Sequence, residues 1–215
     1  MTATAELARA GAKGIDCNTV LTSATCVALK NSGIEFVVRY ARDVKPDEFN
    51  AIIDAGLAVM GCGHVRYPPW KPNAGMGALD GMNLANFAQR AGFATGTTLW
   101  CDIEGVSPEC SSMDVIVYAN AWFDAVSSAN FQPGVYVGFQ SILTASQWFH
   151  ALKMTRYWKS GSNVPTPEQR GFCNVQGCPL DVMLDGILVD HDFIQPDNFG
   201  DLPMWSIKTV SLPNV

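Results

Sequence analysis

The alternation of strand-like and helix-like segments constrains the fold of this 215-residue chain more than any other feature. Short runs rich in β-branched and aromatic residues, such as residues 36–41, alternate with stretches whose apolar residues recur at helical spacing, such as residues 115–126. Thr22 or Ser23 is expected to cap the first helix, and Gly33 follows its end. Alternation of this length is typical of a parallel α/β architecture.

About eight strands are expected, and this number favours a closed barrel over an open sheet. We therefore predict an α/β fold, a (β/α)8 TIM-type barrel with reduced helices near the C-terminus. A chain of this length without a linker fits a single domain, residues 1–215, with the barrel core at about residues 12–195. The expected strands lie at residues 14–18, 36–41, 58–64, 97–105, 134–138, 156–160, 173–176 and 187–192.

Charge and motifs exclude several classes of partner. The formal net charge is −6 and Lys and Arg form no long run, so neither nucleic acid nor a membrane surface is an expected partner. Neither GxGxxG nor GxxxxGK[ST] follows the first strand, which disfavours a nucleotide cofactor. Seven cysteines without a CxxC pair predict free, mostly buried thiols in a reducing compartment.

Asp102 and Glu104 close the apolar segment of residues 97–105. Residues i and i+2 of a strand project from the same face, so the two carboxyl groups lie together. This arrangement costs desolvation and mutual repulsion, and it adds nothing to the stability of a fold. Acid–base chemistry uses such a pair, because crowding raises the pKa of one carboxyl group toward the range of a general acid at neutral pH. We predict that Asp102 and Glu104 are catalytic.

Other polar and aromatic residues are expected at the same end of the barrel, where the carboxyl ends of parallel strands form the active face. Asp16 ends the first strand and would join the catalytic pair. A single acid at a strand end is more often a helix cap, and an aromatic residue in a strand is more often core. Trp70, which lies in a loop, is the better candidate for a sugar-stacking surface. The predicted substrate-binding residues are Asp190, Asp192, Tyr40, His64, Tyr136, Trp158 and Gln176.

Nucleophilic and metal chemistry are less favoured. No GxSxG elbow is present, and Cys17 and Cys101 alternate with the inward-facing acids and should face the helices. Cys62 beside His64 is the remaining pairing for a cysteine nucleophile. Three interpretations of His64 stay open: a core histidine, a substrate contact or a metal ligand. We predict neither a metal site nor a cofactor, because a lone histidine among acids is a poor metal ligand set.

Three segments at strand positions resemble a known family, namely Gly14-Ile-Asp16, Asp102-Ile-Glu104 and Val189-Asp-His-Asp-Phe193. Their order is similar to that of the glycoside-hydrolase-like barrels called domain of unknown function 1906, which are related to the Chalaropsis-type muramidases of glycoside hydrolase family 25. The resemblance covers about residues 12–195. Residues 33–40, 55–59 and 134–138 are also similar.

This resemblance implies a lysozyme- or muramidase-type glycosidase that cleaves the β-1,4 bond between N-acetylmuramic acid and N-acetylglucosamine in peptidoglycan. It implies Glu104 as the general acid and Asp102 as the group that stabilises or attacks the oxocarbenium-like centre. Asp16 and Asp190 would orient these groups and bind the substrate. Asp192 stands where the muramidases usually have Asn, and we expect it to add a negative charge. The predicted partner is therefore a carbohydrate.

Two other functions stay open. The barrel could bind a glycan without cleaving it, with its acids holding sugar hydroxyl groups, or His64 could serve a metal-assisted hydrolase. The N-terminus has no basic segment followed by an apolar one, and no window is long and apolar enough to cross a membrane. We therefore expect synthesis in the cytoplasm, with release to the cell wall through phage lysis or a secretion system.

Overall fold

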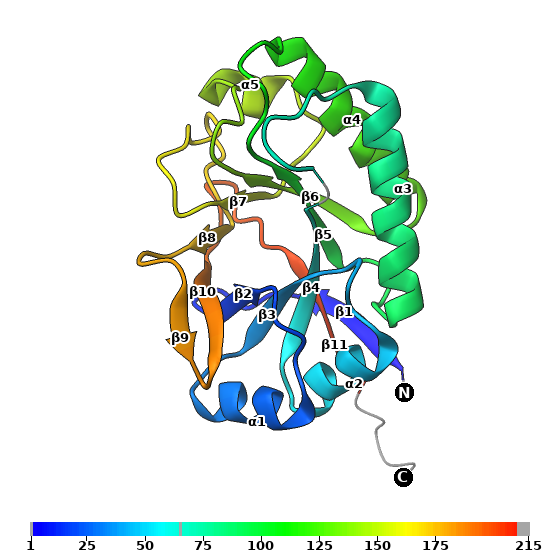
Figure 1. The fold of residues 1–215 in the computed structure, drawn as a ribbon, viewed down its shortest axis with the longest axis vertical. Helices are drawn as coiled ribbons and strands as arrows, with labels where there is room; N and C mark the ends of the chain where they lie inside the picture. The colour runs from blue at the N-terminus through cyan, green and yellow to red at the C-terminus, as the bar shows by residue number, and fades with distance from the viewer. Residues whose placement is uncertain (1, 65, 210–215) are drawn as a thin grey trace.

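A computed structural model describes residues 2–64 and 66–209, and it shows a strand barrel with helices packed against its outside (Figure 1). Pairing between β4 and β5 closes the sheet on itself, which confirms the predicted α/β barrel of the TIM type. Within the described residues the barrel strands are β2 (Lys13–Cys17), β3 (Phe36–Tyr40), β4 (Ala58–Gly63), β5 (Thr98–Ile103), β6 (Gln132–Val137), β7 (Tyr157–Lys159), β8 (Asn174–Gln176) and β10 (Ile187–Ile194).

The last barrel strand differs from the parallel strand that the sequence predicts. Strands β2 to β8 run parallel to one another, whereas β10 is antiparallel to both β2 and β8. A parallel pairing needs a long crossover connection, and only residues 177–186, which include the short strand β9 (Val182–Leu184), join β8 to β10. Asp190 therefore reaches the open end of the barrel from the middle of β10, where it pairs with Asp16 of β2.

The described helices all precede residue 151, so the predicted loss of helices toward the C-terminus is correct. Thr22 caps the first helix by accepting a hydrogen bond from the Thr25 amide, and Ser111 forms a capping box with Asp114. Among the described residues, no helix combines the length and the apolar character needed to cross a bilayer. The helices are α1 (Ser23–Asn31), α2 (Pro46–Asp54), α3 (Ala74–Ala91), α4 (Ser112–Ser128) and α5 (Ala145–His150).

Two strands near the chain ends were not predicted. β1 (Ala3–Leu7) pairs in antiparallel fashion with β11 (Met204–Lys208), and Ser206 of β11 pairs with Val59 of β4. The Trp205 ring lies 5.8 Å from the ring of Phe36, which begins β3, so this ribbon covers the amino-terminal end of the barrel. The alternation of exposed and half-buried residues in β1 leaves no apolar run that could reveal it.

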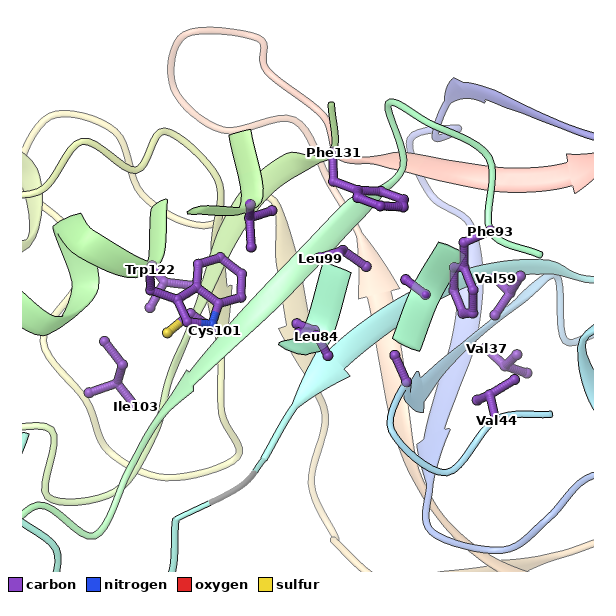
Figure 2. Packing of buried hydrophobic residues seen from close by; sticks show 14 of the residues in the cluster. Val37, Val44, Val59, Leu84, Phe93, Leu99, Cys101, Ile103, Trp122 and Phe131 are labelled. Carbon is purple, nitrogen blue, oxygen red and sulfur yellow. The ribbon is translucent and has the colours of Figure 1, made fainter. Parts of the chain in front are cut away.

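The core has two layers that follow the alternation of side chains along each strand. Val37, Val59, Leu99 and Ile103 point outward and pack against the helices, as Figure 2 shows for the side containing Trp122. An inner cluster, which includes Val38, Met60, Trp100 and Trp158, fills the barrel. Cys17 and Cys101 belong to the outer layer, as predicted, and all seven cysteines are free thiols.

Candidate active site

A cavity of about 230 Å³ opens at the carboxyl end of the barrel strands. Eight of the ten predicted site residues line it, because the barrel brings the ends of β2, β3, β5, β6, β7 and β8 to one place. The alternation rule explains why the sequence identified these inward-facing positions. The lining residues are Asp16, Tyr40, Cys62, Asp102, Glu104, Tyr136, Trp158, Ser162, Gln176, Leu180 and Asp190.

Glu104 follows the last residue of β5, and its main chain is held on both sides. The indole of Trp70 donates a hydrogen bond of 2.6 Å to the Glu104 carbonyl oxygen, and the Gly105 amide donates one of 2.7 Å to the carbonyl oxygen of Phe139. The left-handed backbone of Gly105, with φ 61°, turns the chain at this point. Trp70 is only 6% exposed, so the expectation that it offers a sugar-stacking surface is wrong: it supports Glu104 from within.

Space beside Glu104 is created by Gly138, just after β6. A Cβ atom at position 138 would lie 2.4 Å from Cβ of Glu104, closer than real side chains approach. The Glu104 side chain is 31% exposed, so it reaches the cavity rather than the helix layer. Burial and the charge of Asp102 raise its pKa to about 7, while His64 opposes the increase.

Asp102 lies deeper than Glu104, and its partner is His64 from the loop after β4. Nδ1 of His64 donates a hydrogen bond of 2.6 Å to Oδ2 of Asp102 and lies 3.5 Å from Glu104. Burial raises the pKa of Asp102 even though the His64 bond lowers it, and the same bond raises the pKa of His64 above 6.5. His64 is therefore an electrostatic partner of the acid pair.

Gln176 connects the acids on the other side of the cavity. Its Nε2 donates hydrogen bonds of 2.8 Å to Asp16 and 3.0 Å to Asp190, while Tyr136 donates its hydroxyl to Oε1 over 3.0 Å. Burial raises the pKa of Asp16 to about 7, opposed mainly by the Gln176 bond. Asp190 also accepts a 2.6 Å bond from the Asp181 amide, which fixes its carboxylate. These contacts make one polar wall that faces Asp102 and Glu104.

Two predicted substrate-binding residues, Trp158 and Asp192, lie deeper inside the barrel than the others. Asp192 has no exposed surface and accepts a hydrogen bond of 2.8 Å from the Trp158 indole, whose own exposure is 2%. Trp158 forms the floor of the cavity and Asp192 lies beneath it, away from the opening. Their predicted roles in substrate binding stay predictions.

A second cavity of about 440 Å³ adjoins the first, because Glu104 and Tyr40 line both. Four of its lining residues are absent from the predicted site, namely Asn18, Arg42, Asp43 and Tyr67. Tyr67 is 71% exposed, and its ring lies edge-on to His64 with 5.7 Å between centroids. The sequence feature that could have identified Tyr67 is its position in the loop after the third strand. In that loop we expected Trp70, and not Tyr67, to contact a sugar. Leu180 and Ser162 of the first cavity lie in loops without a recognisable motif.

Cys62 is the cysteine that faces the cavity, but its chemistry is unfavourable for a nucleophile. Complete burial and the nearby Asp102 raise the pKa of the Cys62 thiol well above 9. A nucleophilic cysteine needs the opposite shift, toward the thiolate. The cysteine–histidine pairing that the sequence left open is therefore not supported.

His64, Asp102 and Glu104 could together hold a metal ion, since each offers one ligand atom and these atoms lie within 4.8 Å of one another. An ion bound at Nδ1 of His64 would replace the proton that this atom now donates to Asp102, and it would displace the proton from Glu104. The same three residues are thus suited either to acid catalysis or to a metal.

Comparison with known families agrees with the barrel. A family model described as "Rv2525c-like, glycoside hydrolase-like domain" matches residues 27–178, which include β3 to β8 and the Asp102–Glu104 pair. No curated protein matches the sequence significantly.

Solved structures with the same fold have low sequence identity. The Tat-secreted protein Rv2525c of Mycobacterium tuberculosis, in complex with L-tartrate, is 16% identical, with a TM-score of 0.65 over 88% of this chain and 98% of that chain. A bacterial lysozyme from Streptomyces coelicolor is 17% identical, with a TM-score of 0.56 over 86% and 92%. The spore cortex lytic enzyme SleM of Clostridium perfringens is 11% identical, with a TM-score of 0.64 over 86% and 67%. At these identities the likeness is one of fold.

Proposed function

The chain belongs to the family of Rv2525c-like, glycoside hydrolase-like domains, and from this membership we propose a glycosidase of the lysozyme or muramidase type that cleaves β-1,4 bonds of peptidoglycan amino sugars. The observation that carries the proposal is Glu104 in the cavity opening, with a pKa of about 7 and Asp102 beside it. A carboxyl group with this pKa is protonated in a large fraction of molecules at neutral pH, as a general acid must be.

In the proposed reaction, Glu104 donates its proton to the glycosidic oxygen as the bond to the leaving sugar breaks. Asp102 faces the oxocarbenium-like centre and stabilises it, or attacks it directly, and Asp16 orients the substrate. One oxygen of Asp102 and one of Glu104 lie within 4.8 Å of each other. Inverting enzymes separate their carboxyl groups by about 6.5–9.5 Å to admit a water molecule, so this geometry supports retention of configuration.

The fold neighbours named as a lysozyme and as a spore cortex lytic enzyme support a cell-wall glycan as the class of substrate. The tyrosine-lined second cavity continues the first past Glu104, which gives a polysaccharide chain room on both sides of the acid. A peptidoglycan substrate requires release of the protein from the cytoplasm, through phage lysis or a secretion system.

Digestion of purified peptidoglycan tests the proposal. Wild type and Glu104→Gln would be incubated with the polymer, and new reducing ends would be identified by mass spectrometry. The expected result is reducing-end muramic acid with wild type and a loss of activity of at least about 100-fold in the variant. Glu109→Gln is the matched control, because Glu109 is an exposed glutamate paired with Lys71. Equal activity of wild type and Glu104→Gln would reject Glu104 as the acid, and no product from any folded protein would reject the glycosidase.

A second candidate, a barrel that binds glycan without cleaving it, is favoured by one observation. His64 lies 2.6 Å from Asp102 and 3.5 Å from Glu104, and a protonated imidazole there favours the ionised form of both acids. Carboxylates suit hydrogen bonds to sugar hydroxyl groups better than they suit proton donation. This candidate predicts saturable binding of glycan fragments, with no product, that Glu104→Gln changes by less than about threefold.

A further inference from the structure

Asp16, which lines the cavity, and Asp192, which lies beneath the cavity floor, form a second acid pair, of which the proposed reaction uses only Asp16. Asp192 is fully buried in β10, opposite Gly14 of β2, and it lies diagonal to Asp16 across the antiparallel pair. Interaction between the two side chains lowers the pKa of Asp16 and raises the pKa of Asp192, as a hydrogen bond from one carboxyl group to the other would.

Two carboxyl groups form a hydrogen bond only when one of them carries a proton, because an ionised carboxylate has acceptors and no donor. One oxygen of Asp192, Oδ1, accepts the bond from the Trp158 indole over 2.8 Å. The other, Oδ2, is buried and receives no hydrogen bond from any described residue. An ionised Asp192 would leave Oδ2 unpaired and bring two anions into contact, whereas a neutral Asp192 satisfies both oxygens.

The surroundings decide which of the two acids holds the proton. Asp16 lines the cavity and accepts a hydrogen bond of 2.8 Å from Gln176, which favours its ionised form. Asp192 has no contact with solvent, and the titratable groups that face it are Asp16 on β2 and Asp190 on its own strand. The neighbouring strands β7 and β8 present Trp158 and Gln176, which are neutral. Burial, with Asp16 next in importance, raises the pKa of Asp192 well above its usual range.

We propose that Asp192 stays protonated at neutral pH and acts as a positioning residue, donating a hydrogen bond that holds Asp16 as a carboxylate facing the cavity. Asp192 then adds no negative charge to the site, contrary to the expectation from the sequence. Asp16 is held from two sides, by the amide of Gln176 and by the carboxylic acid of Asp192. The inference rests on the proposed function in one respect only, namely that Asp16 has a role in the reaction.

The first test follows the protonation of each aspartate in the full wild-type chain by ¹³C NMR of the carboxyl carbons, assigned through the backbone. Asp192 is expected to remain in its protonated form from about pH 5 to about pH 8. Asp190, which is on the same strand and partly exposed, is the internal control and should ionise at a lower pH than Asp192. Ionisation of Asp192 near the ordinary aspartate pKa of about 3.9 would overturn the proposal.

The second test measures positioning through the titration of Asp16. Asp192→Asn keeps a donor toward Asp16 and an acceptor for Trp158, whereas Asp192→Leu keeps neither. The pKa of Asp16 is expected to be higher by about one unit in the leucine variant than in the asparagine variant. Equal Asp16 titration in the two folded variants would overturn the positioning role, because a packing role alone would not move this pKa differently.

If Asp192→Leu does not fold, a measurement on the wild-type protein tests the positioning role of Asp192. Exchange of the shared proton for deuterium shifts the carboxyl-carbon resonance of Asp16 if Asp192 donates to it, and no shift would reject the bond. Neither measurement requires turnover. A protonated Asp192 in a protein that releases no sugar would therefore reject the proposed function while keeping this inference.

Discussion

The Nδ1 atom of His64 lies 2.6 Å from Oδ2 of Asp102 and joins the loop after β4 to strand β5. Parallel pairing of Gly63 with Cys101 brings the two residues together, since His64 and Asp102 each follow by one position. The imidazole is thus built into the acid pair, where it opposes the rise in pKa of both Asp102 and Glu104.

Replacing His64 should move the pH profile of activity. In His64→Gln the pKa of Glu104 rises, because the positive charge that lowers it is gone. If the active form has a protonated Glu104, the alkaline limb of kcat/KM should move to higher pH by up to about one unit, together with a lower maximum. Release of soluble fragments from dye-labelled peptidoglycan across the pH range measures this. His150→Gln, an exposed histidine that pairs with Glu168, should leave the profile unchanged. An alkaline limb that stays in place would contradict the coupling.

Glu104→Gln should be inactive and yet more stable than wild type above pH 7. The folded-state pKa of Glu104 is about 7, raised from 4.5, so between these values the native protein binds more protons than the unfolded chain. Its stability therefore falls as the pH rises through this window. The variant lacks this loss, and its free energy of unfolding should exceed that of wild type by on the order of 3 kcal/mol above pH 7.

Urea denaturation at several pH values measures this difference, which should vanish below about pH 4.5 where Glu104 is neutral. Glu109→Gln is the control, because its exposed carboxylate has a lowered pKa and gives no such gain. If the variant is no more stable than wild type at high pH, then burial and Asp102 do not raise the pKa of Glu104.

The sequence predicted the barrel and most of the site for one reason, the period-two alternation of its strands. Inward positions of β2, β5 and β8 could be read directly, so Asp16, Asp102, Glu104 and Gln176 were placed correctly at one opening. The direction of the last strand could not be predicted in this way. The reversed β10 follows from the short connection through β9, and the sequence indicated β8 and β10 as the last two strands without showing that they are antiparallel.

Contacts between distant segments could not be read from alternation. The bond from the Trp70 indole to the Glu104 carbonyl oxygen depends on how a loop folds back over 34 positions, so a loop tryptophan looked like an exposed surface. From the sequence we expected Asp192 to carry a negative charge, and our proposal of a neutral Asp192 depends on two features that only the structure shows, its unpaired Oδ2 and its neighbour Asp16. Protonation is set by the local environment, which a residue type alone does not reveal.

Gly138→Ala should reduce activity by displacing Glu104. The added methyl group would lie 2.4 Å from Cβ of Glu104 and 3.1 Å from the Ile103 carbonyl oxygen, so the acid must move. A displacement of about 1 Å costs about 100-fold in rate when a reacting group must be aligned. Peptidoglycan digestion and thermal unfolding would be measured together. Gly75→Ala is the matched control, since its methyl group meets only Asn73 at an ordinary 3.4 Å. Full activity in a folded Gly138→Ala protein would place the acid elsewhere.

Metal removal separates acid catalysis from metal-assisted hydrolysis at the same three residues. Dialysis against a chelator should leave the activity unchanged, because Glu104 acts through its proton. Excess Zn²⁺ should inhibit, since His64, Asp102 and Glu104 offer ligand atoms within 4.8 Å of one another and a bound ion would replace that proton. Inhibition should weaken at lower pH, where protons compete with the ion, and it should weaken in His64→Gln. Activity that disappears with the chelator and returns with Zn²⁺ would instead assign these residues to a metal.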